Sequence, residues 1–474
     1  MGKQQPFLYE KVASYVADMI DEGTLKPGEK APSLRLLMQS QHISLATATQ
    51  AYKNLEDRGY IEARPQSGFY VSHRYTSRLQ EPAETTPYQA PESVKIAKPI
   101  LKLLEYYASD PSLHPFGCAI PSPEILAAGK LDLILAKKAR HNGKDHNNYS
   151  PAQGNVDLRN EIANRSTRLG LKLTKDNITI TNGCTEALTL ALKVVTKPGD
   201  AVALESPIYF GILQILDALG LKAFELPTSK HGINIDALYD AVTSNKIKAC
   251  LFISSFSNPL GCTLSINQKL SIIDLLKEYN IPLIENDIYG DMYFGKVRPK
   301  SFLSLAPDAN IIYCNSFSKS IAPGYRIGWI ISFCHIEKIT ETKFGLSICC
   351  PTLLQASLAT YLNSGNYDRH IQKIKLALQI NVEKTRYAIS KFFPKQTKVS
   401  NPAGGFVLWL ELDKKINSAE LFEKAIEQGI SFAPGSLFTT TDNYNNCMRI
   451  CCGHEWTPAL EKAIQTLGNL VKEG

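Results

Sequence analysis

Long hydrophobic runs are missing from this chain. No stretch approaches the roughly 20 apolar residues that a membrane-spanning helix needs. The first residues, Met1 to Pro6, also lack the apolar core of a signal peptide. No internal repeat and no low-complexity tract stands out. These absences predict a soluble protein of the cytoplasm.

Cysteines are present, but they do not form a spaced framework. They number eleven, and Cys349-Cys350 and Cys451-Cys452 are adjacent pairs with poor geometry for a disulfide or a zinc site. We therefore expect free, buried thiols in a reducing compartment, and no metal ion.

A strong excess of one charge is also lacking. The net charge is +7 over 474 residues, and residues 1–75 hold nine Lys and Arg against eight Asp and Glu, a net charge of +1. Such a mild charge permits an anionic partner without requiring one, so a nucleic-acid site must be argued from where charges lie. With 44% hydrophobic and 20% charged residues, the chain can build globular cores, and its length suggests about three domains.

Residues 1–75 predict a winged helix-turn-helix domain. Apolar residues recur at helical spacing over 8–20, and Ser33 and Ser44 are suitable caps for two further helices. Two short strands follow, at 60–63 and 68–71. The third helix of such a unit can enter the major groove of DNA.

The segments 25–35, 51–56 and 59–71 resemble the DNA-binding domain of the GntR family. The resemblance implies that double-stranded DNA is contacted by Ser33, Arg35, Ser44, Thr47, Thr49, Arg64 and Gly68. One departure is Leu45-Ala46, where the family often carries an arginine. Base readout is then expected from Thr47, Thr49 and Gln50, or from apolar contact with thymine methyl groups. The alternative is a winged helix used for protein contacts, since few basic residues line the third helix.

Residues 76–110 predict a linker. The segment 76–91 is rich in Pro, Ser and Thr without periodicity, which favours an extended chain over a packed one. Residues 95–109 have helical spacing.

Residues 111–474 predict an α/β architecture. Short apolar runs alternate with helical stretches at 178–181, 201–204, 250–253, 282–284 and 311–313. This order is typical of a mostly parallel sheet with crossover helices, here over about 111–335. From about 336 to 474, long helices and isolated strands predict a smaller α+β part.

The run from Ser316 to Gly328 follows a buried strand and is the most specific motif of the chain. It places Lys319 next to Ser318 and sets Arg326 behind a Pro-Gly turn. A lysine at a strand end can form a Schiff base with an aldehyde cofactor. A guanidinium with its planar fork can grip a phosphate. The alternative is a solvated lysine and a salt-bridged arginine.

Further candidate residues follow the neighbouring strands, at the sheet edge where ligands of open α/β sheets gather. They are Gly183, Cys184, Thr185, Tyr209, Asn258, Asp287 and Tyr289. Taken singly, Tyr209 could be a core residue, Asn258 a turn former and Asp287 a helix cap.

As a set they fit pyridoxal 5′-phosphate (PLP). Helix-start N–H groups at 183–185 can cradle its phosphate, beside the hydroxyls of the lysine motif. Tyr209 can stack on its ring, while Asn258 and Tyr289 can hydrogen-bond its ring hydroxyl. Asp287 can keep its pyridine nitrogen protonated.

The segments 149–154, 181–183, 258–259, 287–289 and 316–328 resemble class I and II aminotransferases, of PLP fold type I. The resemblance covers roughly 110–474. It implies that Tyr149 reaches the cofactor phosphate, in its own or the partner subunit, and that Arg449 binds an amino-acid α-carboxylate. A structural salt bridge is the alternative role for Arg449. The following Cys451-Cys452 leaves the side-chain preference open.

A winged helix joined to an aminotransferase-like domain resembles the MocR subfamily of GntR regulators. This resemblance implies a bacterial transcription factor that forms a head-to-tail homodimer on a DNA operator. Its PLP-binding domain would sense an amino acid or amine effector, or PLP itself. The alternative is an active PLP-dependent aminotransferase (transaminase) that carries a DNA-binding head.

Overall fold

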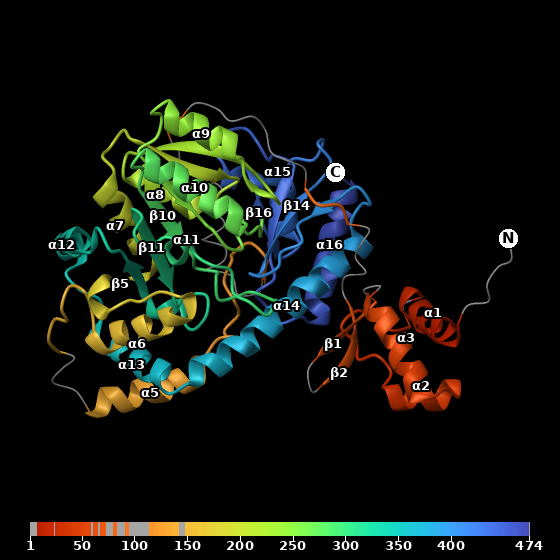
Figure 1. The fold of residues 1–474 in the computed structure, drawn as a ribbon. Coiled ribbons are helices and arrows are strands. Elements are labelled where there is room, and N and C mark those ends of the chain that lie inside the picture. Colours follow the sequence, from red (N-terminus) through yellow and green to blue (C-terminus); the bar gives the residue numbers. More distant parts are fainter. Residues whose placement is uncertain are drawn as a thin grey trace.

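The computed structural model describes residues 7–22, 24–57, 60–64, 67–72, 79–82, 91–93, 113–141 and 147–473. The helix expected at 95–109 lies outside these residues. Figure 1 colours the winged-helix head red to orange, the large α/β part from orange through green to cyan, and the C-terminal part blue. Within the described residues, no helix is both long and apolar enough to cross a membrane.

The head has the predicted order of three helices and a hairpin. Its elements are α1 (Leu8–Asp21), α2 (Leu34–Gln41), α3 (Leu45–Asp57), β1 (Ile61–Arg64) and β2 (Gly68–Val71). Ser33 caps α2 by accepting from Leu36 N at 3.1 Å, and Ser44 Oγ accepts from Thr47 N at 3.2 Å. The buried face of α3 forms the centre of the small core, with Tyr52 and Leu55 fully enclosed. The winged helix is therefore confirmed.

The large part is built on a nine-stranded mixed sheet with the strand order β3-β7-β6-β9-β10-β11-β12-β5 and β8 at the edge. The strands are β3 (Glu92–Ser93), β5 (Ile178–Thr181), β6 (Ala201–Ser206), β7 (Lys222–Ser229), β8 (Gly232–Ile233), β9 (Ala249–Phe252), β10 (Leu283–Asn286), β11 (Ile311–Ser316) and β12 (Gly328–Ile331). The five strands from β7 to β11 run parallel, and β12 is antiparallel to both of its neighbours. The predicted mostly parallel sheet is therefore confirmed.

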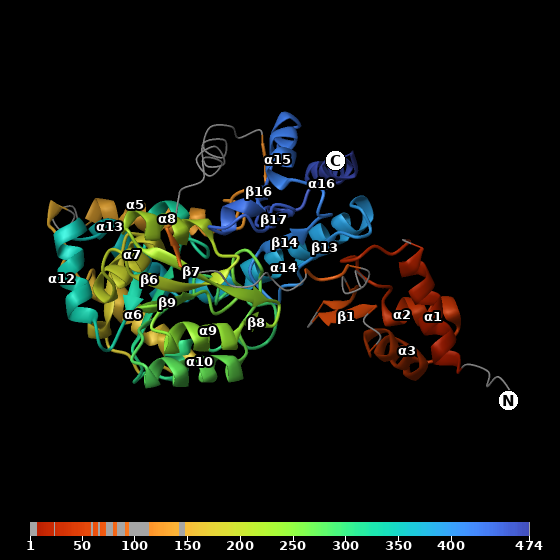
Figure 2. The ribbon, with the colours of Figure 1, turned by 90° about the horizontal axis from the view of Figure 1, so that it is seen from above.

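Helices cover both faces of this sheet (Figure 2). One face packs on α5 (Ala128–His141), α6 (Val156–Ser166), α9 (Ile235–Thr243), α10 (Ile266–Glu278), α11 (Phe302–Leu305) and α13 (Thr352–Asn363). The other packs on α7 (Gly183–Val195), α8 (Phe210–Ala218) and α12 (Ile336–Ser347). Helix α14 (Asn366–Phe392) contributes to both core clusters. Strands enclosed on both faces are mostly apolar, which explains the short apolar runs in the sequence.

The C-terminal part has its own antiparallel sheet, in the order β13-β14-β17-β16. Its elements are β13 (Lys398–Val399), β14 (Val407–Glu411), α15 (Ser418–Glu427), β15 (Ile430–Ser431), β16 (Ala433–Pro434), β17 (Cys447–Cys451) and α16 (Pro458–Glu473). The 27-residue helix α14 runs from α13 to α16 and joins the two parts (Figure 1). Because α12 and α13 still pack on the large part, the chain leaves that part along α14 rather than near residue 336.

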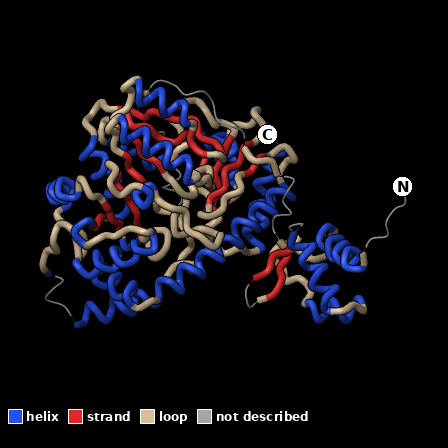
Figure 3. The backbone as a smooth tube through the Cα atoms, viewed as in Figure 1, coloured by secondary structure: helices blue, strands red, loops and turns tan. Residues whose placement is uncertain are grey.

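Two described pieces of the linker region are attached to the body instead of being free. Gln80 O accepts from Val399 N at 2.8 Å, and β3 adds to the edge of the large sheet by pairing with β7. The first strand after the linker, β4 (His114–Pro115), pairs with β15 of the C-terminal part. The expectation of an unpacked linker therefore fails at these points. Figure 3 shows the loops that surround the strands of the body.

Candidate functional sites

The turn after β11 holds Lys319 in a fixed position. Ser316 Oγ accepts from Ser318 N at 2.9 Å and lies 2.7 Å from Ser318 Oγ, which closes the turn. Lys319 Nζ then donates to Ala119 O at 2.7 Å. Burial lowers the pKa of Lys319 to about 8, with the Arg449 and Arg326 cations acting in the same direction. The amine is therefore close to its neutral, nucleophilic form.

An anion cradle lies beside this lysine. Arg326 adopts a left-handed backbone (φ 52) and donates to Ser318 Oγ at 3.4 Å and to Asn182 O at 3.2 Å. Gly183, the first residue of α7, has φ +81, and a Cβ there would collide with the Arg326 guanidinium. The N-terminus of α7 and the guanidinium therefore meet at one point, an arrangement suited to a phosphate.

At the other end of the site, side chains of the large part and of the C-terminal part meet. Asn258 Nδ2 donates to Tyr289 OH at 3.2 Å, while Asn258 Oδ1 accepts from Arg449 Nη1 at 3.3 Å. Arg449 is fully buried on β17, and its Nη2 donates to Gly117 O. These described partners of Arg449 are uncharged, and its buried Nε has none. The salt bridge considered for this arginine is thus not formed with the described residues.

These groups surround a cavity of about 180 Å³. Its lining includes the predicted Cys184, Thr185, Tyr209, Asn258, Tyr289, Ser318, Lys319, Arg326 and Arg449. The charged groups of the lining are three cations, and it contains no carboxylate among the described residues. Such a site favours an anionic ligand.

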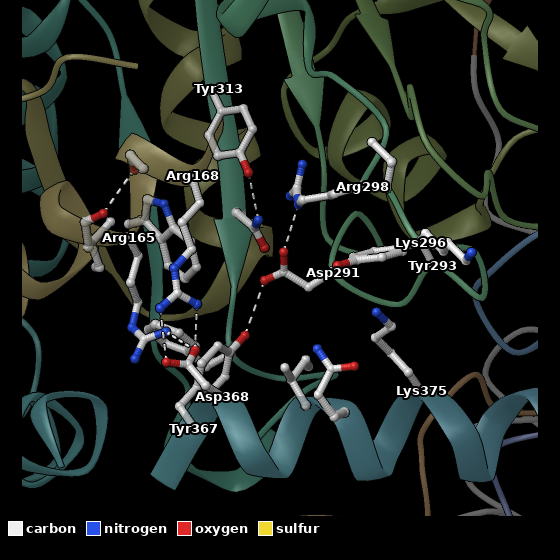
Figure 4. A pocket seen from close by; sticks show the side chains of 18 residues that line it. Arg165, Arg168, Asp291, Tyr293, Lys296, Arg298, Tyr313, Tyr367, Asp368 and Lys375 are labelled. Carbon is white, nitrogen blue, oxygen red and sulfur yellow. Dashed lines mark hydrogen bonds and ion pairs between the residues drawn. The ribbon is translucent and has the colours of Figure 1, made fainter. Parts of the chain in front are cut away.

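Asp287 is not among the residues that line this cavity. Its Oδ2 accepts from Arg298 Nη2 at 2.6 Å and from Tyr313 OH at 2.9 Å. Both partners line a second cavity, of about 360 Å³, on the opposite face of the sheet (Figure 4). The residue that does face the Lys319 cavity is Asn286. The expected approach of Asp287 to a pyridine nitrogen there does not fit this arrangement.

The physical reason is the alternation of side chains along a strand. Ile284 of β10 belongs to the core cluster on the cavity side, together with Cys314, the register partner of Asn286. Leu283 belongs to the cluster on the other side, as does Tyr313. Continuing this alternation, residue 286 points to the cavity and residue 287 away from it. Because β10 is buried on both of its faces, no signal in the sequence distinguished Asn286 from Asp287.

Tyr149 also lies apart from the cavity of its own chain. Its side chain is 82% exposed and is not part of the lining. The segment 113–120, which we call the strap, is a contributor that the sequence analysis missed. It supplies Cys118 and Ala119 to the lining, as well as the carbonyls that bind Lys319 and Arg449. No motif marks a residue that acts through its backbone carbonyl.

The head exposes most of its predicted DNA-contacting side chains. Arg35, Ser44, Thr49, Gln50 and Gly68 are exposed, and Thr47 is half-buried beside Ser44. Leu45 is 55% exposed at the start of α3 and can supply the apolar contact considered above. Arg64 is less free than expected, because it pairs with Glu62 at 2.8 Å and lies over the Tyr70 ring.

Comparisons with known proteins identify both parts. Residues 8–71 match the family "Bacterial regulatory proteins, gntR family", and residues 121–467 match "Aminotransferase class I and II". The chain is 34% identical to YdcR of Escherichia coli K12, an uncharacterized HTH-type transcriptional regulator, over 98% of this chain and 99% of YdcR. The chain belongs to the MocR subfamily of GntR regulators.

Enzymes of the same fold provide the cofactor assignment for this MocR-type regulator. A 2-aminoadipate transaminase of Thermus thermophilus is 26% identical over 76% of this chain and 91% of its own length. The crystal structure of LysN, the α-aminoadipate aminotransferase of that organism, was solved with N-(5′-phosphopyridoxyl)-L-leucine. It matches 80% of this chain and 95% of its own with a TM-score of 0.74 at 26% identity. The cofactor is PLP, and the cationic cavity beside Gly183 and Lys319 fits its phosphate and its aldehyde.

The close approach of Gly183 to Arg326 in the anion cradle predicts that a methyl group added at residue 183 weakens PLP binding. Gly183→Ala should displace the Arg326 guanidinium and weaken PLP binding by about 10- to 100-fold, the equivalent of one charged hydrogen bond. Titration of the apoprotein with PLP, followed by fluorescence, measures this change. Gly345→Ala is the matched control, because a Cβ at that position meets no atom within 4 Å.

The lowered pKa of Lys319 predicts a pH profile. The rate at which PLP condenses with the apoprotein should rise with pH and level off above about 8, where the buried amine is already neutral. An exposed lysine would instead give a rate that keeps rising towards its ordinary pKa of about 10.4. Stopped-flow absorbance distinguishes the two profiles, and Lys319→Ala should abolish the signal.

The exposed Arg35 of α2 and Gln50 of α3 predict two different defects in DNA binding. Gln50→Ala should relax base preference, at a cost of about 1–3 kcal/mol on the best site. Arg35→Ala should weaken binding to all DNA sequences alike. It should also reduce the slope of log affinity against log salt concentration by about 1. Selection of sites from a random pool, then titration at several salt concentrations, measures both effects. Lys462→Ala, on the exposed side of α16, serves as the control.

Proposed function

We propose that this protein is a PLP-dependent transcriptional regulator that binds an operator through its head and senses an amino acid or amine in the Lys319 cavity. The observation that carries the proposal is Arg449. This guanidinium is fully buried, its described partners are uncharged, and it lines the same cavity as Lys319. A buried cation without a counter-charge is costly, and an incoming carboxylate would balance it.

The side chains divide the recognition of such a ligand among them. When bound, PLP supplies an aldehyde that combines with amines and a ring that withdraws electrons. Arg326 and the start of α7 would hold the phosphate, and Asn258 with Tyr289 would orient the ring hydroxyl. Arg449 would take the α-carboxylate, whose oxygens offer the buried Nε the acceptor that it lacks. Lys319, with a pKa of about 8, would take up or release the proton exchanged with the amine.

The strap offers a route from this cavity to the head. Gly117 O accepts from Arg449 and Ala119 O accepts from Lys319, while Cys451 N binds Phe116 O at 2.9 Å. The strap is also the first described segment after the linker. A ligand that recruits Lys319 and Arg449 would take both donors from the strap and thereby favour another position of the linker. Differential binding of this kind is what a ligand-driven switch requires.

A second copy of the chain would complete the regulator. Tyr149 is exposed and does not line its own cavity, so a head-to-tail homodimer in the cytoplasm could bring it to the partner's cofactor phosphate. Two heads could then contact two half-sites, which suits heads whose net charge is only about +1. The mild charge argues against tight binding by one head.

An active aminotransferase remains the second candidate. It is favoured by the convergence of Lys319, Tyr289 and Arg449 on one cavity, and by the similarity to the Thermus transaminase. Aminotransferase activity would be detected as keto acid formed over many catalytic cycles from an amino donor. A sensor of PLP itself would change its DNA affinity with PLP alone, without any amino acid.

Arg449 gives the decisive experiment. The full-length protein is titrated with operator DNA, first with PLP and then with PLP plus a panel of amino acids and amines. In the wild type, one amino acid should change the DNA affinity. Arg449→Gln should bind PLP but require at least about 10- to 100-fold more of that amino acid, because a charged hydrogen bond is lost.

Arg449→Lys is the matched variant, because it keeps the charge and loses the planar fork. It should restore only part of the response. An Arg449→Gln protein with a wild-type amino-acid response would contradict the proposal, as would a Lys319→Ala protein that responds normally.

A further inference from the structure

The end of β10 presents an amide to the cavity. Asn286 is the last residue of β10 and lines the cavity with Lys319, Tyr289 and Asn258. Two buried carboxylates flank it in sequence, Glu285 and Asp287. Both point to the opposite face, where Glu285 accepts from Phe302 N at 2.9 Å and Asp287 binds Arg298. A ligand in the cavity therefore meets an uncharged side chain at this strand end.

The orientation of this amide is fixed by its neighbours. Asn286 Oδ1 accepts from Ile288 N at 3.3 Å and from the Cys184 thiol at 3.5 Å. A backbone N–H can only donate, so the atom that it meets must be the amide oxygen. Burial raises the pKa of Cys184 to about 12, which keeps that thiol protonated as a donor as well. With Oδ1 committed to these two donors, Nδ2 is the atom left for a ligand.

The charges around the cavity also disfavour a further positive charge on a bound ligand. Its ionisable lining consists of Lys319, Arg326 and Arg449 together with cysteines and tyrosines, and burial raises the pKa of Cys118, Cys184, Tyr209 and Tyr289. These thiols and phenols are therefore neutral. The carboxylate of Asp287 is on the far face and is already paired with Arg298. A protonated ring nitrogen would add a further positive charge to this set.

From these observations we propose that Asn286 donates its Nδ2–H to the pyridine nitrogen of PLP and holds that nitrogen unprotonated. The proposal rests on the proposed function, because it concerns the cofactor of the same cavity. A carboxylate at this position would accept a hydrogen bond from a protonated nitrogen and stabilise it. An amide N–H requires a nitrogen with a free lone pair.

The consequence is a site that binds amines better than it turns them over. Transamination needs the ring to accept the electron pair left when the amino acid loses its Cα proton, and a protonated ring accepts it more readily. Condensation of an amine with the aldehyde relies on Lys319, Asn258 and Tyr289, which the cavity retains. Asn286 would therefore keep recognition and suppress the later step, as suits a regulator.

The test uses the full-length holoprotein loaded with PLP that carries ¹⁵N in the ring. The wild type should show the nitrogen chemical shift of an unprotonated pyridine at neutral pH. Asn286→Asp should move this signal upfield, to the position of a protonated pyridine. The same variant should speed the single-turnover conversion of amino acid to keto acid by about 10- to 100-fold, as one charge-assisted hydrogen bond in the transition state would.

Two further variants keep the test decisive. Asp287→Asn should leave the ¹⁵N shift unchanged, because Asp287 lies on the other face. If Asn286→Asp fails to fold, Asn286→Ala replaces it. The Ala variant should lose the Nδ2–H hydrogen bond, which shifts the ¹⁵N signal downfield from that of the wild type and weakens PLP binding in a fluorescence titration.

A protonated nitrogen in the wild type, or a shift that responds to Asp287→Asn and not to Asn286→Asp, would overturn the proposal. Either result would leave the regulatory function intact, since that function is judged separately by the amino-acid dependence of DNA binding. Conversely, if amino acids do not change the DNA affinity, the proposed function fails but the proposal for the ring nitrogen is not affected.

Discussion

The buried guanidinium of Arg449 is the interaction on which the working site depends. It sits on the sheet of the C-terminal part, reaches Asn258 of the large part, and binds Gly117 O of the strap. Three separate regions thus meet at one positive charge that has no described carboxylate partner. Uncompensated buried charge is unfavourable, so the fold holds a local cost at the point where a carboxylate ligand would relieve it.

The strap connects this charge to Lys319. Lys319 lies in the turn after β11 and Arg449 lies on β17, yet both donate to backbone carbonyls two residues apart in the strap. The strap also pairs with β15 through β4 and follows the linker to the head. Backbone carbonyls are well suited to such a role, because they accept a hydrogen bond from whichever donor is present and are easily exchanged for a ligand oxygen. A change at either donor therefore reaches the same short segment.

The roles proposed for Arg449 and Asn286 separate ligand binding from catalytic turnover. The cavity combines the amine of Lys319, the anion cradle and Arg449, the residue that we propose as the carboxylate anchor. At the strand end it presents an amide, while the neighbouring carboxylate of Asp287 is directed to Arg298. A few kcal/mol of charge stabilisation at a single atom can decide between slow and fast turnover. A transaminase scaffold could thus serve as a sensor without being rebuilt.

Much of the molecule follows from local signals in the sequence. The capping serines of the head, the β-branched runs of the sheet and the tight turn from Ser316 to Arg326 depend on residues close together in the chain, so spacing and composition determine them. The winged helix, the mostly parallel sheet and the lysine motif could be predicted for this reason.

Tertiary structure decided the rest. β10 has four residues, all buried, because both faces of the sheet are covered. A strand enclosed on both sides shows no polar alternation, so nothing in the sequence told whether Asn286 or Asp287 faces the cavity. The uncharged partners of Arg449, the exposure of Tyr149 and the carbonyls of the strap likewise depend on which distant segments meet. Contacts across hundreds of residues are set by packing of the whole fold, and no local pattern encodes them.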